Sequence, residues 1–295
     1  MFGMNEIVGL KHFKNALPNT LTVTSRFYTL QGEGPFRGYP AYFIRLAKCN
    51  LACSFCDTYF DSGQVQTFDE IFADIDRVIA EFYAKRNMPI PQWAQGPIKR
   101  IVLVITGGEP TLQSNLTAFL ERANDVFYHT QIESNGTCPI PLPDKTTLVC
   151  SPKCLEKKVN DVDTAVRYLT PKKEMLARAD CLKFVMGVPE QNRYTPYSEI
   201  PQWAHDWTQT TGKPIFVSPM NIYLREPQKA KERRAMRNTE TTIAERSYID
   251  EVISFWEPGL LDMKANQRNH EYTAEYAMKY GFILNLQIHL YASLP

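Results

Sequence analysis

The sequence has no uninterrupted apolar run near the roughly 20 residues that a membrane-spanning helix needs. Residues 1–19 carry scattered charges and lack the apolar core of a signal peptide. These absences argue against an integral membrane protein and against a secreted one. We therefore expect a cytoplasmic protein with no membrane partner.

The sequence also lacks a charge excess of either sign. With 33 Lys and Arg against 32 Asp and Glu, its formal net charge is +1, so we expect no direct nucleic-acid partner. It contains seven cysteines. The odd count, the length and the missing signal peptide argue against a disulfide scaffold. Clustered cysteines in a reducing compartment more often bind metal.

What the sequence does contain is enough apolar material for a large core, because 44% of its 295 residues are hydrophobic. We interpret residues 1–295 as a single domain, with an N-terminal extension over 1–20 and a charged insertion over 225–270. Residues 225–246 are dense in Lys, Arg and Glu. This composition indicates a solvated helix or a flexible insertion rather than a nucleic-acid contact.

Strand-like and helix-like segments alternate along the chain. Segment 68–82 has apolar residues at helical spacing, and Thr67 and Glu70 form a candidate capping box before it. Ile101–Ile105 is a continuous apolar run typical of a parallel strand buried on both faces, and a helix is expected through 112–123. Further strands are expected at 41–46, 127–133, 147–150, 182–186, 215–218 and 282–289, with a proline-rich loop at 87–97.

Polar or glycine-rich loops follow several of these strands. The succession of strand, loop and helix predicts an α/β fold with a mostly parallel sheet. In α/β barrels and open sheets, the loops after the strands form the active site. We therefore expect the unusual loops of this chain to meet at one end of the sheet.

A Cys-x3-Cys-x2-Cys motif formed by Cys49, Cys53 and Cys56 follows the first expected strand. Three such thiolates can ligate three irons of a [4Fe–4S] cluster and leave the fourth iron open. S-adenosylmethionine can chelate that iron, and one electron can then cleave it to a 5′-deoxyadenosyl radical. The motif therefore predicts a radical S-adenosylmethionine enzyme. The alternatives are an electron-transfer cluster and a zinc site, although a clean second pair of zinc ligands is missing.

Polar residues near this motif suggest how small ligands are held. Thr106-Gly107-Gly108-Glu109-Pro110 closes a buried strand, and its glycines let backbone approach a ligand. Arg45 interrupts an apolar strand and needs an anionic partner, either a Glu of the protein or a substrate carboxylate. Asp57-Thr58 could bind Mg²⁺ or could cap a loop. Leu30-Gln31-Gly32-Glu33-Gly34 is, by itself, equally compatible with a surface turn.

Together these motifs resemble those of the 7-carboxy-7-deazaguanine synthase (QueE) family of radical S-adenosylmethionine enzymes. The resemblance runs in order through 28–34, 43–46, 49–58, 106–110, 133–136, 151–153 and 286–289 to the C-terminal Pro295. It implies an incomplete (β/α) barrel of the radical S-adenosylmethionine type with insertions, usually in a homodimer. It also implies a lyase that contracts 6-carboxy-5,6,7,8-tetrahydropterin to 7-carboxy-7-deazaguanine with loss of ammonia, in 7-deazaguanine (queuosine-type) biosynthesis.

The resemblance further implies cofactors and site residues. Cys49, Cys53 and Cys56 would hold the [4Fe–4S] cluster and Thr58 would bind Mg²⁺. The adenosyl radical, rather than a side chain, would carry out the chemistry, and a flavodoxin or ferredoxin would supply the electron. S-adenosylmethionine would contact Phe55, Cys56, Asp57, Gly108, Glu109, Glu133, Ser134, Asn135, Ser151, Pro152 and Lys153. The pterin would contact Leu30, Gln31, Gly32, Glu33, Arg45, Thr106 and Pro295.

Several features depart from the family pattern. Lys48 occupies a position where glycine is common, and Ser218-Pro219-Met220-Asn221 stands where Gln-Pro-Met-Asp is frequent. Extra length falls before residue 21, around 87–99, between 154 and 180, and within 225–270. Cys138, Cys150, Cys154 and Cys181 match no auxiliary-cluster pattern. Two alternative functions use the same cysteine motif: an activase that makes a glycyl radical on a partner protein, and a non-catalytic iron–sulfur module.

Overall fold

The computed structural model describes residues 7–9, 17–58, 60, 63–189, 192–224, 261–292 and 294. Its strands are β1 (Thr20–Leu30), β2 (Pro40–Leu46), β3 (Gln64–Thr67), β4 (Lys99–Gly107), β5 (Phe127–Ser134), β6 (Thr146–Cys150), β7 (Cys154–Val159), β8 (Val162–Tyr168), β9 (Cys181–Met186), β10 (Ile215–Pro219) and β11 (Ile283–Leu284). Its helices are α1 (Phe68–Ala84), α2 (Leu116–Ala123), α3 (Lys173–Arg178), α4 (Gln202–Thr211), α7 (Met263–Tyr280) and α8 (Ile288–Ala292), with short 3-10 helices at Gly34–Phe36, Gln92–Ala94, Pro110–Leu112 and Asn192–Ser198.

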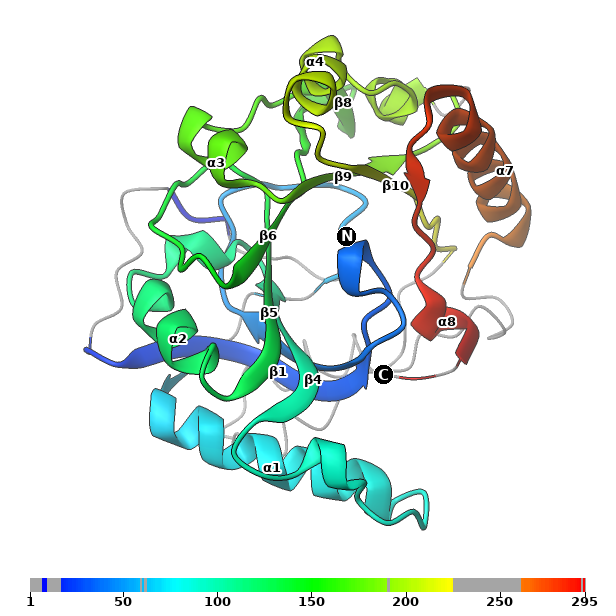
Figure 1. The fold of residues 1–295 in the computed structure, drawn as a ribbon. Helices are drawn as coiled ribbons and strands as arrows, with labels where there is room; N and C mark the ends of the chain where they lie inside the picture. Colours follow the sequence, from blue (N-terminus) through cyan, green and yellow to red (C-terminus); the bar gives the residue numbers. More distant parts are fainter. Residues whose placement is uncertain are drawn as a thin grey trace.

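Nine strands form one curved sheet in the order β11-β10-β9-β6-β5-β4-β2-β1-β3. Neighbouring strands from β2 to β11 are parallel, whereas β1 is antiparallel to β2 and to β3. Helices α1, α2, α3, α4 and α7 lie around the outside of the sheet (Figure 1). Since β3 and β11 end the order of the described strands without pairing to each other, the barrel is incomplete, as predicted.

Local sequence explains the best-predicted elements. Thr67 and Glu70 form the predicted capping box: the Glu70 N–H donates to Thr67 Oγ1 at 3.2 Å, and the Thr67 N–H donates to Glu70 Oε2 at 2.7 Å. Helix α1 then buries the apolar stripe that includes Ile71, Ile75 and Ile79. In β4, residues 101–105 are all buried, as expected of a parallel strand covered on both faces.

The strand predictions need correction in two respects: β1, β3, β7 and β8 were not predicted, and the strand predicted at 282–289 is mostly not a strand. Strand β1 was not predicted, because Arg26 interrupts its apolar pattern; this side chain is buried in an ion pair with Asp74 at 2.5 Å. Segment 282–289 is not one strand: only Ile283–Leu284 pair with β10, and a helix begins at Ile288. The ladder ends at Asn285, whose side chain donates to Ser218 Oγ at 2.8 Å and accepts from the Gly34 N–H at 3.0 Å.

Two of the regions of extra length, the segment 225–270 and the segment before residue 21, are partly described by the structure. Residues 225–260 of the expected charged insertion lie outside the described residues. Residues 263–270 of this segment form the first part of α7, which packs on β10. Near the N-terminus, the Val8 N–H donates to the Cys49 carbonyl at 2.9 Å.

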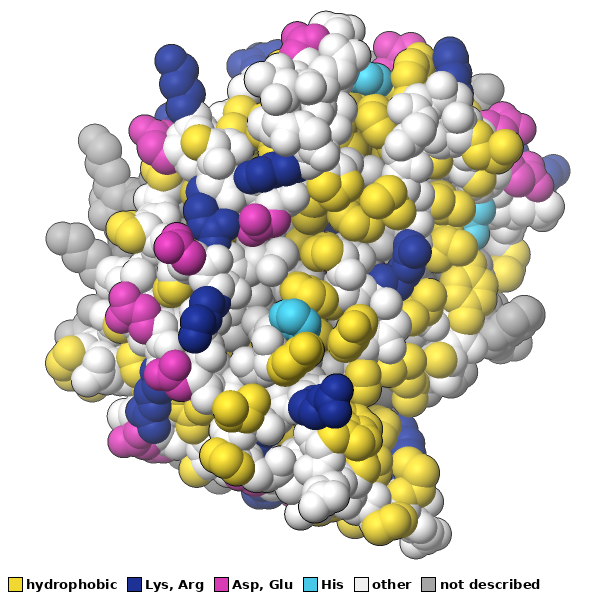
Figure 2. All heavy atoms as spheres, in the orientation of Figure 1, with side chains coloured by type: hydrophobic (Ala, Val, Ile, Leu, Met, Phe, Trp, Pro, Cys, Tyr) yellow, Lys and Arg dark blue, Asp and Glu magenta, His cyan; other side chains and the backbone are white. Residues whose placement is uncertain are grey.

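The face of the molecule drawn in Figure 2 carries mixed charge. On the face in Figure 2, basic and acidic side chains are interspersed rather than gathered by sign. None of the helices in the described ranges is long and apolar enough to cross a membrane.

Candidate active site

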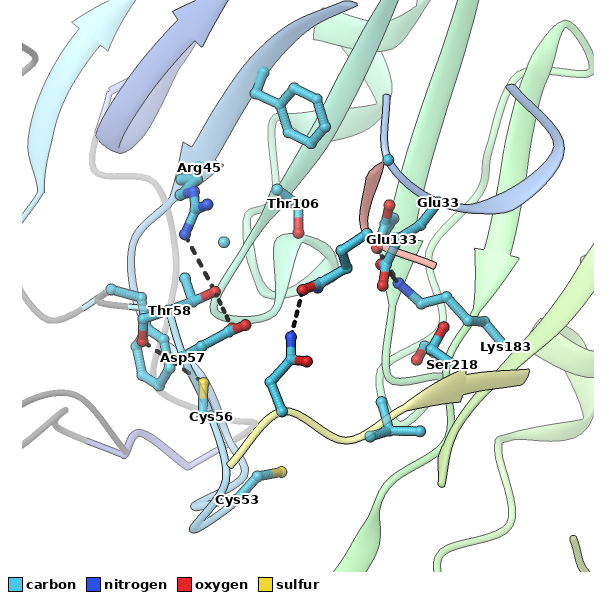
Figure 3. A pocket seen from close by; sticks show the side chains of 18 of the residues that line it. Glu33, Arg45, Cys53, Cys56, Asp57, Thr58, Thr106, Glu133, Lys183 and Ser218 are labelled. Atoms are coloured by element: carbon cyan, nitrogen blue, oxygen red, sulfur yellow. Dashed lines mark hydrogen bonds and ion pairs between the residues drawn. The ribbon is translucent and has the colours of Figure 1, made fainter. Parts of the chain in front are cut away.

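The carboxyl ends of the parallel strands carry most of the predicted site residues. The pairing of β2 with β4 puts Arg45 opposite Thr106, and the pairing of β5 with β6 puts Glu133 opposite Val149. These ends face a cavity of about 300 Å³ (Figure 3). The predicted residues that line it are Leu30, Gln31, Gly32, Glu33, Arg45, Cys49, Cys53, Phe55, Cys56, Asp57, Thr58, Thr106, Gly108, Glu133, Ser134, Asn135, Ser151 and Lys153.

Three predicted residues are not among those that line the cavity. Glu109 is 1% exposed and lies behind the wall, and Pro152 is buried beside Ser151 and Lys153. Pro295 lies outside the described residues. The Leu30–Gly34 segment is not a surface turn before the first strand. It connects β1 to β2 and contributes four residues to the cavity wall.

Close backbone packing fixes the cysteine loop. A Cβ atom at Gly107 would lie 2.2 Å from the Leu46 carbonyl oxygen, and one at Gly108 would lie 1.8 Å from that of Lys48. The two glycines therefore allow the β4 loop to contact the chain before Cys49, rather than only a ligand. Lys48 has φ +75°, a left-handed conformation that favours glycine. This conformation explains why glycine suits the position.

The buried Glu109 carboxylate connects the β4 loop to the β5 loop. It accepts hydrogen bonds from Ser134 Oγ at 2.8 Å, the Asn135 N–H at 2.7 Å and the Thr111 N–H at 3.1 Å. Burial raises the pKa of Glu109, while these donors act to lower it. Asn135 in turn donates to Asn50 Oδ1 at 3.0 Å, beside Cys49. Glu109 thus orders the loops that surround the cavity.

Arg45 projects into the cavity from β2. One of its terminal N–H groups donates to Thr58 Oγ1 at 3.2 Å, and its guanidinium lies 5.1 Å from the centre of the Phe27 ring. Within the described part of the chain, Arg45 forms no ion pair, and its buried Nε has no hydrogen-bond partner. The protein Glu considered as a partner is therefore not found there. A half-buried guanidinium whose Nε is buried without a partner can bind an anionic ligand.

A second charged group lies across the cavity from Arg45 (Figure 3). Lys183, from β9, is ion-paired to Glu33 and to Glu133, the latter at 2.6 Å. Burial lowers the pKa of Lys183, but the carboxylates of Glu133 and Glu33 raise it by more, so the net pKa lies above its ordinary value. Gln31 Nε2 also donates to Glu133, at 3.3 Å. The group carries two negative charges and one positive charge.

The comparisons with known proteins agree on one family. No protein-family model matches the chain. The 7-carboxy-7-deazaguanine synthase of Rickettsia prowazekii is 34% identical over 201 residues, which cover 68% of this chain and 74% of that protein. The enzyme of the same name from Rhodospirillum rubrum is 32% identical over 68% of this chain and 75% of its own length. The chain belongs to the 7-carboxy-7-deazaguanine synthase family.

The fold agrees with this membership. The crystal structure of QueE from Escherichia coli aligns with a TM-score of 0.51 at 20% sequence identity, over 91% of this chain and 94% of that one. The likeness confirms the predicted architecture. Family membership also implies a radical S-adenosylmethionine enzyme with a [4Fe–4S] cluster.

The cysteine loop fits the cluster that 7-carboxy-7-deazaguanine synthases use. Cys49, Cys53 and Cys56 all line the cavity, and the Cys56 N–H donates to the Cys53 carbonyl at 3.1 Å. Burial, the largest cause, raises the pKa of Cys49 to about 12 and that of Cys56 to about 11, so ligation would displace protons from buried thiols. Each iron of a cubane takes one thiolate, so the three need not converge on one point.

The zinc alternative needs the opposite geometry, with several ligands converging on one ion. Across the described ranges, no group of three or more His, Cys, Asp or Glu side chains is arranged to hold a single metal ion. The donor set therefore suits a cluster better than a mononuclear site.

Sequence reasoning missed some residues of this 7-carboxy-7-deazaguanine synthase cavity, above all Lys183. The sequence did hold a signal, because Lys183 interrupts the apolar strand 181–186 as Arg45 interrupts β2. His289 and Tyr223 also line the cavity. Burial lowers the pKa of His289. Both come from segments far from the cysteine motif, so only the fold brings them to it.

Proposed function

We propose that this chain converts 6-carboxy-5,6,7,8-tetrahydropterin to 7-carboxy-7-deazaguanine with loss of ammonia. The observation that carries the proposal is the charge distribution of the cavity. Arg45 lies on one side, and the carboxylates of Glu33 and Glu133 lie on the other. The substrate has the complementary polarity, with a carboxylate at one end and a guanidine-like edge of N–H donors at the other.

At the carboxylate end, Arg45 would bind the substrate through a charge-assisted hydrogen bond. Thr58 would bind Mg²⁺ there, since its hydroxyl lies between Arg45 and Asp57, at 3.2 Å and 3.3 Å. A magnesium ion keeps most of its waters and needs few protein ligands. Together, Mg²⁺ and Arg45 would hold the two oxygens of the substrate carboxylate in a fixed orientation.

At the other end, Gln31 and Glu33 would accept the N–H groups of the pyrimidine ring, next to Glu133, which is assigned to S-adenosylmethionine. The Glu33 N–H donates to Gln31 Oε1 at 3.1 Å, and Lys183 contacts both carboxylates. These contacts orient the acceptors before substrate binds, which reduces the entropy cost of binding. Thr106, Leu30 and Gly32 would complete the substrate site, with Pro295 as a further contact.

S-adenosylmethionine would occupy the space between the cysteine loop and the strand ends. When bound there, it would supply the radical chemistry of the reaction, which is hydrogen abstraction from C6 of the pterin. The residues proposed to hold it are Phe55, Cys56, Asp57, Gly108, Glu133, Ser134, Asn135, Ser151 and Lys153. Glu109 and Pro152 would act from behind the wall by positioning these groups. A flavodoxin or ferredoxin is the proposed electron donor, and a homodimer is the proposed assembly.

Anaerobic turnover tests the proposal. The reconstituted protein, incubated with the carboxytetrahydropterin, S-adenosylmethionine, Mg²⁺ and a reductant, should form 7-carboxy-7-deazaguanine. Cleavage of S-adenosylmethionine on an intact cluster without this product would refute the substrate and would favour the glycyl-radical activase. Protein that binds iron and sulfide but never cleaves S-adenosylmethionine would instead be a non-catalytic module.

A further inference from the structure

The β7–β8 hairpin, which falls in the extra length between residues 154 and 180, is held against the cysteine loop. Its two-residue turn, Asn160-Asp161, has positive φ at both positions, 50° and 61°, the geometry of a tight type I′ hairpin. At its base the Cys154 N–H donates to the Tyr197 hydroxyl at 2.9 Å. The Tyr197 ring packs edge-on against Phe55, with centroids 5.0 Å apart. The hairpin therefore has a defined position beside the loop.

One side chain of the hairpin reaches into the cysteine loop. The Ser54 N–H, between Cys53 and Cys56, donates to Glu156 Oε2 at 3.0 Å. Ser54 directly follows Cys53, so this hydrogen bond holds the Glu156 carboxylate beside the ligand segment of the loop. The charge of Glu156 therefore lies close to a cluster held by the three cysteines.

Both features of Glu156 bear on the electron affinity of a cluster in this loop. Adding an electron adds negative charge, which a nearby carboxylate disfavours. Backbone N–H groups directed at cluster sulfurs favour the reduced state. Glu156 accepts the Ser54 N–H, so that donor is directed to the carboxylate instead. The two effects have the same sign, since each lowers the reduction potential.

We propose that Glu156 of the β7–β8 hairpin lowers the reduction potential of the [4Fe–4S] cluster that Cys49, Cys53 and Cys56 would hold. This inference rests on the proposed function only for the presence of the cluster. The redox step concerned is the transfer of one electron from a low-potential donor, which converts the cluster core from the 2+ to the 1+ state. Glu156 is a positioning and electrostatic residue for this step, and it is not among the residues that line the cavity.

The test is an anaerobic redox titration of the reconstituted full chain, followed by electron paramagnetic resonance of the reduced cluster. Glu156→Gln keeps the side-chain length and removes the charge. At a potential equal to the wild-type midpoint, the ratio of reduced to oxidised cluster in this variant should be at least threefold higher than in the wild type. For a one-electron couple, this increase corresponds to a midpoint potential about 28 mV more positive. Glu156→Asp, which keeps the charge, should stay closer to wild type. Asp163→Asn removes the same charge from an exposed position of the hairpin and should leave the midpoint unchanged.

Two results would overturn the inference. A Glu156→Gln midpoint equal to that of the wild type would show that the charge has no effect on the cluster. Failure of Glu156→Gln to assemble a cluster that Glu156→Asp and Asp163→Asn do assemble would assign Glu156 a structural role in the loop. If the wild-type chain itself assembles no cluster, the proposed function fails together with the inference.

Discussion

Replacement of Lys183 by Met should destabilise the protein strongly, because it removes the cation from a buried group of three charges. Lys183 is 8% exposed, and its partners Glu133 and Glu33 are 14% and 15% exposed. Methionine approximates the aliphatic part of the side chain, so packing changes little. The variant leaves two carboxylates facing each other, and the net charge of the group changes from −1 to −2.

The expected cost follows from the burial of the group. Removing one partner of a buried ion pair typically costs about 3–5 kcal/mol, because the remaining charge is left uncompensated. At roughly 2–4 °C per kcal/mol, the melting temperature should fall by roughly 6–20 °C. The double variant Glu33→Gln/Lys183→Met restores the net charge of −1 and should recover part of the loss. Lys145→Met, at an exposed position, should change stability by no more than about 0.5 kcal/mol.

The pH dependence gives a second check on the reasoning. Lys183 has a folded-state pKa above its unfolded value of roughly 10.4. The contribution of Lys183 to the free energy of unfolding is therefore fully present below the unfolded-state pKa. It is lost only as the pH rises through the folded-state pKa. The difference in melting temperature between wild type and Lys183→Met, measured by anaerobic differential scanning fluorimetry, should stay constant from pH 7 to 9. A Lys183→Met variant within about 2 °C of wild type at pH 7 would refute the reasoning.

Three further predictions concern other residues of the site. Arg45→Ala should raise the KM for the pterin by roughly 10- to 100-fold, the equivalent of losing a charged hydrogen bond, while iron and sulfide content stay at the wild-type level; loss of the cluster would instead indicate a structural role. Deletion of Pro295 should reduce turnover more than it reduces melting temperature, and the reverse order would contradict a terminal substrate contact. Lys48→Gly should raise the melting temperature slightly, by an amount equivalent to less than about 1 kcal/mol, because the φ of +75° is strained for lysine; a fall would show that the lysine side chain contributes more than the strain costs.

Much of the fold was predictable from local patterns. The buried run Ile101–Ile105, the capping box at Thr67 and the polar loops after strands are all short-range signals, and the structure confirms the elements that they predicted. Strand β1 was missed because the charged Arg26 near its centre interrupts the apolar pattern of the strand. Its ion pair with Asp74, a residue of α1, could not be inferred from sequence spacing. The helix at Ile288–Ala292 was missed because Asn285 ends the strand through long-range hydrogen bonds.

The active site shows the same difference between local sequence signals and long-range contacts. The cysteine motif and Arg45 were evident because each departs from its surroundings in the sequence. Lys183 departs in the same way, but its partners lie 150 and 50 residues away, so no local pattern indicates what it pairs with. Glu109 was predicted to contact S-adenosylmethionine, and the structure shows that it orders two loops through Ser134 and Asn135. Sequence motifs identified the chemistry, whereas the tertiary fold determines which motif residues face the cavity.

The most direct test of the account is the ratio of product to S-adenosylmethionine consumed. The resemblance to the family implies that S-adenosylmethionine is regenerated in each turnover. In an anaerobic reaction with a reconstituted cluster, Mg²⁺ and a reductant, mass spectrometry should therefore find more than one 7-carboxy-7-deazaguanine per S-adenosylmethionine consumed. Accumulation of 5′-deoxyadenosine with no deazaguanine product, on an enzyme whose cluster is intact, would contradict the account.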